Sequence, residues 1–173
     1  MEGVKRFLSG ELVIKCKFDV WKTIKLGTGP KNAGDFRKII KDNGFSISDY
    51  GNDILGQPAF TVATEETELD LVVVSVAELG FKVGATRELI YVRAKEFGLD
   101  LCPAEVGPQL RLQYKDQPNG EWFIVAMEPI ISSVGDLRLF DVEQVGSGLW
   151  LESCSGSPVC FWNFGTRFVF SRK

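Results

Sequence analysis

The sequence of 173 residues contains no histidine. Histidine is the side chain that most often serves as a general base or metal ligand near neutral pH, so catalysis by a serine or cysteine that histidine activates is excluded. Cysteine is also scarce, and the four cysteines form no Cys-x-x-Cys pair. This pattern favours buried, reduced thiols over a disulfide scaffold or a zinc site. We predict free thiols even for Cys154 and Cys160, which flank a short segment.

The sequence also lacks a long apolar run. Residues 69–79 form its longest apolar stretch, which Asp70, Ser75 and Glu78 interrupt. This stretch is shorter than the roughly 20 residues that span a bilayer. The first six residues begin no apolar segment of the kind that a signal peptide contains. We therefore expect a cytoplasmic protein that has no membrane partner.

What is present is an ordinary globular composition, with 45% hydrophobic residues, 25% charged residues and a formal net charge of -3. A chain of this length predicts one domain over residues 1–173. Lysines concentrate in residues 1–44, whereas residues 45–80 contain acidic residues and no basic ones. The early lysines alternate with apolar residues, which is more typical of a solvated edge strand than of a nucleic-acid contact. Nucleic acid is therefore not an expected partner.

Three helices are predicted in the first half of the chain. The second and third follow Ser48 and Thr86, which are residue types whose side chains accept backbone hydrogen bonds at a helix N-terminus. We expect Tyr50 and Leu89 to lie on the buried faces of these two helices. The three predicted helices cover residues 32–44, 48–55 and 86–97.

Strands are predicted on both sides of these helices. The strongest hairpin signal joins an alternating segment at residues 110–114 to a strand at 122–127, through a turn at Asn119 and Gly120. A short helix is expected to begin at Cys102 and to end at Gly107 and Pro108. The other predicted strands cover residues 12–18, 23–26, 69–76, 137–145, 149–153 and 167–171, and the first two of them are expected to form a hairpin.

Together these elements predict an α+β fold in a single domain, with a mostly antiparallel sheet and two to four short helices in the N-terminal half. The helix-containing half is expected to cover about residues 1–107. The strand-rich half, an antiparallel meander, is expected to cover about residues 108–173.

Three segments carry a resemblance to known sequences. They read GLDLCPAEVGPQLRLQYKDQPNGEW at residues 98–122, WKTIKLGTG at residues 21–29 and LDLVVVSVAELGF at residues 69–81. In these segments the chain resembles a group of uncharacterised bacterial conserved hypothetical proteins, and the similarity covers about residues 20–173. The resemblance implies a bacterial cytoplasmic protein. It supplies no functional residue, since no activity is known for that group.

Acidic residues offer two kinds of site. Glu66, Glu68 and Asp70 alternate along an extended segment, so their oxygens share one face and are a candidate for binding Mg²⁺ or Ca²⁺. The alternative interpretation is the wet side of a strand that enters the core, and we assign no metal ligand and no cofactor. A glycosidase-like pair is the second kind of site, but the spacing selects no pair. The isolated acids that offer one member of such a pair are Glu105, Glu121 and Glu128.

Aromatic residues concentrate in the strand-rich half and offer a binding platform. Several of them, together with polar neighbours, are expected to share one face and to stack a sugar ring, a base or a partner's side chain. The alternative interpretation is packing in the core of the sheet, since aromatic residues at strand period are usually buried. The candidate ligand-binding residues are Arg111, Gln113, Tyr114, Trp122, Trp150 and Trp162.

Two classes of function stay open. The leading hypothesis is a non-catalytic binding or interaction module with a protein or small-molecule partner, because no catalytic group is assembled in the sequence. The alternative is a carboxylate-dependent, metal-assisted or metal-free hydrolase. A closed polar pocket that gathers two or more acidic residues favours the enzyme, and a shallow surface with exposed tryptophan favours the module.

Overall fold

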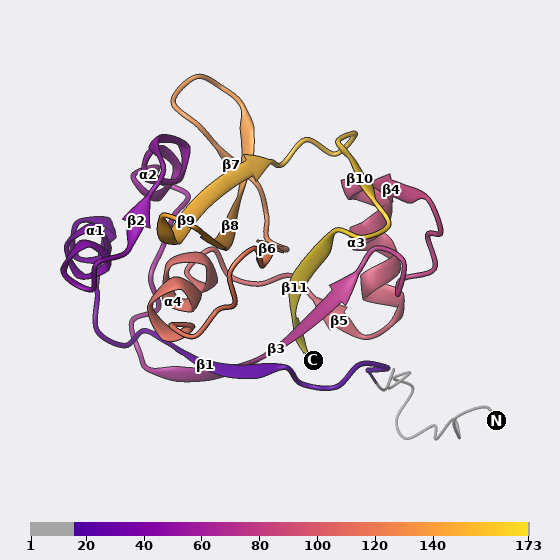
Figure 1. Cartoon of the computed structure of the whole chain (residues 1–173), viewed down its shortest axis with the longest axis horizontal. Helices are drawn as coiled ribbons and strands as arrows, with labels where there is room; N and C mark the ends of the chain where they lie inside the picture. The colour runs from indigo at the N-terminus through magenta and orange to yellow at the C-terminus, as the bar shows by residue number, and fades with distance from the viewer. Residues whose placement is uncertain (1–15, 173) are drawn as a thin grey trace.

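The computed structural model describes residues 16–172, in which four helices accompany one large, mostly antiparallel sheet (Figure 1). The predicted α+β class, with strands dominating, is confirmed. The helices are α1 (Ala33–Asp42), α2 (Asp49–Leu55), α3 (Arg87–Glu96) and α4 (Val106–Gln113). The strands are β1 (Lys22–Leu26), β2 (Ser46–Ile47), β3 (Thr67–Ser75), β4 (Gly84–Thr86), β5 (Leu99–Asp100), β6 (Trp122–Val125), β7 (Ile130–Ile131), β8 (Leu137–Val145), β9 (Gly148–Ser155), β10 (Phe161–Asn163) and β11 (Arg167–Arg172). None of the helices in residues 16–172 is long and apolar enough to cross a membrane.

The first three helices begin where the sequence predicts. The side chains of Asn32, Ser48 and Thr86 each accept a backbone hydrogen bond from the first turn of α1, α2 or α3. This satisfies N–H groups that have no partner inside the helix. The predicted burial of Tyr50 and Leu89 is wrong, because both side chains are exposed. The Arg138 guanidinium stacks on the ring of Tyr50, and α3 buries Ile90 and Ala94 but not Leu89.

The main sheet has the strand order β1-β3-β11-β6-β8-β9-β2. Its pairings are antiparallel except β6 with β11 and β2 with β9, which are parallel. β3 lies between β1 and β11, and β8 with β9 forms a long hairpin, as predicted. The predicted C-terminal meander is interrupted, because β11 crosses back to insert between β6 and β3 of the first half. A separate two-stranded sheet joins β4 to β10.

The predicted hairpin at the N-terminal end is not formed in the described residues. Residues 12–15 lie outside the described part of the chain, and residues 16–18 are not in a strand. β1 pairs instead with β3 and forms an edge of the sheet. The side-chain amide of Gln113 accepts from the backbone N–H of Lys25 at 2.9 Å and donates to its carbonyl at 2.8 Å. This edge is therefore partly covered by α4, which limits pairing with another chain.

The predicted strand at residues 110–114 is wrong, because these residues belong to α4 and its C-cap. The alternation of apolar and polar residues suggested a strand, yet Arg111 points inward and is fully buried. Buried residues recur at Val106, Leu110 and Tyr114, the four-residue spacing of a helix face. Asn119 and Gly120 therefore lie in the connection from α4 to β6, not at a hairpin tip.

The short helix expected from Cys102 is also displaced. Cys102 instead forms a parallel bridge with Met127, and α4 begins at Val106. Pro108 lies in the first turn of α4, where its missing N–H has no helical acceptor to lose. The fourth helix thus crosses the expected boundary between residues 107 and 108. Figure 1 shows α1, α2 and α4 together at one end of the molecule and α3 beside β4 and β10 at the other.

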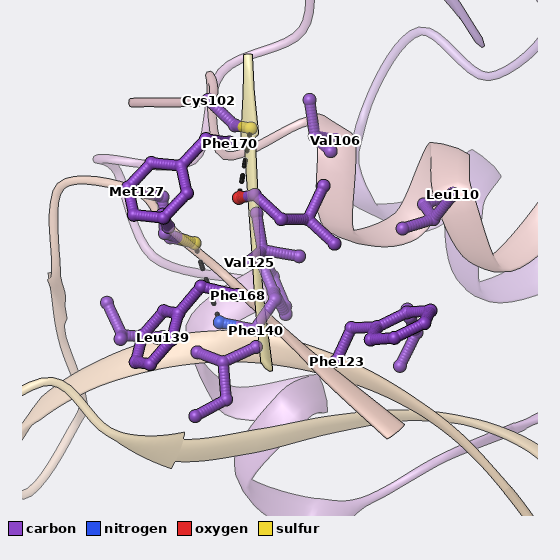
Figure 2. Close-up of a cluster of buried hydrophobic side chains, with 14 of the residues drawn as sticks. Cys102, Val106, Leu110, Phe123, Val125, Met127, Leu139, Phe140, Phe168 and Phe170 are labelled. Atoms are coloured by element: carbon purple, nitrogen blue, oxygen red, sulfur yellow. Dashed lines mark hydrogen bonds between the residues drawn. The ribbon is translucent and has the colours of Figure 1, made fainter. Parts of the chain in front are cut away.

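Side chains from α4, β6, β8 and β11 pack together in the core, part of which Figure 2 shows. The Cys102 thiol donates to the carbonyl of Val169 at 3.5 Å, and the Phe140 N–H donates to the sulfur of Met127 at 3.4 Å. α4 lies very close to β8, because a Cβ at Gly107 would lie 2.6 Å from the ring of Phe140. A larger residue at this position would push the helix from the sheet.

We therefore expect Gly107→Ala to destabilise the protein by about 2 kcal/mol, although alanine usually favours a helix. The added methyl group overlaps the Phe140 ring, which is fully buried. Urea unfolding of the variant measures this loss. The matched control is Gly146→Ala, where nothing lies within 4 Å of the added Cβ and we expect a change below about 0.5 kcal/mol. Equal stabilities of the two variants would contradict this packing.

Candidate functional site

The six expected platform residues do not share one surface. Arg111 and Tyr114 are buried, and Gln113 binds the backbone of β1. Trp150 lines a separate hollow of about 380 Å³ beside β2, and its Nε1 donates to the hydroxyl of Ser147 at 3.1 Å. The remaining two tryptophans, Trp122 and Trp162, come together from strands far apart in the sequence.

Trp122 and Trp162 form one wall of a hollow over β8 and β9. Their ring centroids lie 6.4 Å apart, with an angle of 55° between the rings. Trp162 is fixed by edge-on packing against Phe168 of β11, at 6.2 Å between centroids. Trp122 is 37% exposed and so presents part of its ring to solvent. The two indoles therefore provide a partly rigid aromatic surface at the sheet face.

The floor of the hollow consists of residues that alternate along β8 and β9. In the register of this hairpin, Asp141 lies opposite Glu152 and Leu139 lies opposite Cys154. Glu143 lies opposite Trp122 on β6. Because directly opposite residues and residues two apart share a face of a sheet, these side chains all point to the same side. The hollow has a volume of about 330 Å³, is open to solvent and is lined by Trp122, Asp141, Glu143, Glu152, Cys154 and Trp162.

The surroundings of Asp141 and Glu143 raise the pKa of both carboxyl groups. Asp141 is only 6% exposed, and burial, reinforced by the charges of Glu143 and Glu152, raises its pKa to about 8. Burial and the charge of Glu152 also raise the pKa of Glu143. Burial and the nearby Asp141 raise the pKa of the Cys154 thiol, which therefore stays protonated. Asp141 is thus largely protonated at neutral pH.

Among the described residues that line the hollow, none is a lysine or arginine that would balance these acids. The charge of Arg138, which is not in the lining, partly opposes the rise of the Cys154 pKa. In the same part of the chain, the buried Nε1 of Trp162 has no hydrogen-bond partner. A buried indole N–H usually has one, so an unpaired donor in the wall of a hollow is unusual. The carboxylates and the indole rings can attract a positively charged group, whereas the unpaired indole N–H calls for an acceptor atom.

The acidic residues that were weighed as a candidate metal site make other contacts. Glu66 forms an ion pair with Lys25 at 2.8 Å, and Asp70 accepts from the hydroxyl of Thr23 at 2.6 Å. Glu68 lies opposite Lys25 in the pairing of β1 with β3. Within residues 16–172, no group of three or more Cys, Asp or Glu side chains is arranged to hold a metal ion.

The three isolated acids do not form a pair either. Glu105 is buried and its two carboxylate oxygens accept from the backbone N–H groups of Gly27, at 2.7 Å, and Ala63, at 2.8 Å. Glu121 accepts from the hydroxyl of Tyr114 at 2.6 Å. Glu128 lines a different hollow, of about 600 Å³, between α3 and β5. Glu105 therefore joins two loops to the start of α4, which is a structural role.

The acids of the hollow were missed by the sequence analysis, although a signal for them was present. Both strands of the β8–β9 hairpin were predicted, and Gly146 and Ser147 form the short turn between them. A two-residue turn sets the register, which places Asp141 opposite Glu152. Applying the turn rule to this hairpin would have brought the acids together. All four cysteines lie in the described residues and are free thiols there.

Comparison of the chain with protein families, with curated proteins and with solved structures finds no match. The resemblance to bacterial conserved hypothetical proteins therefore stays a prediction. The function has to be argued from the residues of the hollow and their chemistry.

Proposed function

We propose that this protein is a non-catalytic binding module whose ligand carries an organic cation, an ammonium or guanidinium group. The cation lies in the hollow beside Trp122 and Trp162, over Asp141 and Glu152. The observation that carries this proposal is the gathering of three carboxyl groups in a lining that contains no basic residue among the described residues. A positively charged ligand would offset the free-energy cost of ionising these buried groups and would weaken the repulsion between them.

An organic cation fits this chemistry better than a metal ion or a sugar. Indole rings attract ammonium and guanidinium groups through their π faces, and carboxylates accept their N–H groups. A bare metal ion makes no use of the tryptophans. A sugar stacks on tryptophan but brings no positive charge to the acidic residues Asp141, Glu143 and Glu152.

The test uses N-acetyl-arginine amide and N-acetyl-lysine amide as probes, with N-acetyl-citrulline amide as the neutral equivalent of arginine. We expect the cationic probes to bind, and to bind more tightly at pH 9 than at pH 6, because the cation favours ionised Asp141. Trp122→Ala and Glu152→Gln should each weaken binding by about tenfold, since each removes one attraction to the cation. Calorimetric titration measures all of these affinities.

Trp21→Ala is the matched control, because it removes a tryptophan that packs against Tyr114 and Phe123 and does not line this hollow. Its affinity for the cationic probes should stay within twofold of the parent protein. Equal binding of the citrulline probe would contradict the proposal. So would a disaccharide that binds while the cationic probes do not.

A carboxylate-dependent hydrolase is the second candidate, and one observation favours it. Asp141 holds a proton near neutral pH directly opposite Glu152, which is the combination of a general acid and a second carboxylate. Hydrolysis of aryl glycosides by the purified protein, lost in both Asp141→Asn and Glu152→Gln, would favour the enzyme over the binding module.

A further inference from the structure

The three carboxyl groups of the hollow lie in two rows across the sheet. Asp141 of β8 lies opposite Glu152 of β9, and this pair forms the first row. Glu143 lies two residues further along β8 and forms the second row, opposite Trp122 of β6 on one side and Trp150 of β9 on the other. Since a strand rises about 3.4 Å per residue, the two rows are about 7 Å apart along the backbone. The hollow therefore places acidic side chains at two separate positions.

A single cation compensates only part of this acidic lining. Burial is the main cause of the raised pKa of Asp141, and the charges of Glu143 and Glu152 add to it. Burial and the charge of Glu152 likewise raise the pKa of Glu143, so the two rows interact unfavourably when ionised. No lysine or arginine lines the hollow among the described residues. A cation at one row therefore leaves the other row without a counter-charge, whereas a ligand with two cations supplies one to each.

The indole wall runs beside these acids and suits an alkyl chain that ends in ammonium groups. Trp122 and Trp162 line the same hollow as both rows, with 6.4 Å between their ring centroids. Indole rings pack against methylene groups and attract ammonium groups through their π faces. The volume of the hollow, about 330 Å³, is at the lower end of the range for small-molecule sites. These features favour a short, linear ligand.

We infer that the ligand of the hollow is a linear diamine, with one ammonium group at Asp141 and Glu152 and the other at Glu143. An extended chain of four carbon atoms separates the two nitrogen atoms by about 6 Å, which is close to the spacing of the two rows. This inference rests on the proposed function, since it names the ligand that carries the cation. It adds a second cation and assigns Glu143 as the residue that binds it.

The test compares 1,4-diaminobutane with 4-amino-1-butanol, which has the same length but replaces one ammonium group by a neutral hydroxyl group. In calorimetric titrations at pH 7 we expect the diamine to bind at least tenfold more tightly, because its second contact is intramolecular once the first has formed. In Glu143→Gln this advantage should fall below threefold, while the affinity for the amino alcohol stays within threefold of that of the parent protein.

The matched control is Glu128→Gln, because Glu128 is an exposed glutamate that lines a different hollow. This variant has the same change in net charge as Glu143→Gln and should keep the full advantage of the diamine. An equal loss of the advantage in both variants would assign it to the overall charge of the protein and would overturn the inference.

The other outcomes separate this inference from the proposed function. Equal binding of the diamine and the amino alcohol, with N-acetyl-arginine amide still bound, overturns the inference and leaves the function in place. An advantage of the diamine that persists in Glu143→Gln does the same, because the second cation then lies elsewhere. Failure of every cationic probe, the diamine included, overturns both.

Discussion

Replacing Asp141 by asparagine is expected to stabilise the protein, most strongly at alkaline pH. Burial and the neighbouring acids raise the pKa of Asp141 from 3.8 to about 8 in the folded protein. The folded state therefore holds a proton that the unfolded state releases above about pH 4, and the stability falls as the pH rises toward 8. The two pKa values are about four units apart, which corresponds to at most about 6 kcal/mol above pH 8.

Urea unfolding between pH 5 and pH 9 measures this effect. The free energy of unfolding should fall with pH in the parent protein more steeply than in Asp141→Asn, and the variant should be more stable by about 3 kcal/mol or more at pH 9. Asp116→Asn, which changes an exposed aspartate, is the control and should change stability by less than about 0.5 kcal/mol. A variant with the same pH dependence as the parent would contradict the protonated state of Asp141.

Replacing Arg111 by alanine should have the largest destabilising effect, about 4 to 5 kcal/mol. Arg111 is fully buried, and burial lowers its pKa to about 10. Its guanidinium donates to the side chain of Gln117 at 2.7 Å and to three backbone carbonyls, those of Tyr114, Glu143 and Trp150. Alanine leaves these acceptors without their donor and creates a cavity between α4, β8 and β9.

Arg111→Met separates the two causes, because methionine fills much of the space but donates no hydrogen bond. We expect this variant to lose about 3 kcal/mol, which chemical denaturation measures. The carbonyls of Glu143 and Trp150 belong to opposite residues of β8 and β9, so Arg111 also fixes the strands that carry the floor of the hollow. Parent-like stability of Arg111→Met would show that the hydrogen bonds contribute nothing net.

The elements that the sequence predicted correctly depend on local signals. Ser48 and Thr86 act as N-caps through hydrogen bonds within one turn, and β8 and β9 follow from short-range alternation and a turn. α4 was missed because Arg111 was counted as an outward polar residue. Two of its four acceptors, the carbonyls of Glu143 and Trp150, lie on β8 and β9 more than 30 residues away, and no local pattern reveals them.

In the candidate site, too, features that depend on local sequence could be predicted and features that depend on distant contacts could not. Trp122 and Trp162 were predicted as members of a platform, but their contact depends on β10 lying over β11. Arg111 and Tyr114 were assigned to the same platform because the wrong strand was expected there. The acids of the hollow needed the register of the β8–β9 hairpin, which the turn at Gly146 and Ser147 sets. The charged part of the site was therefore predictable in principle, and the aromatic part required the tertiary fold.

The cation site itself is tested most directly by the indole N–H signals in a ¹H–¹⁵N NMR titration with N-acetyl-arginine amide. The chain has four tryptophans, each with one such signal. We predict saturable shifts for Trp122 and Trp162, which line the hollow, and an unchanged signal for Trp21, which packs against Tyr114 and Phe123 away from it. Shifts confined to Trp21 or Trp150, or no saturable shift in any of the four, would contradict the assignment of this hollow as the binding site.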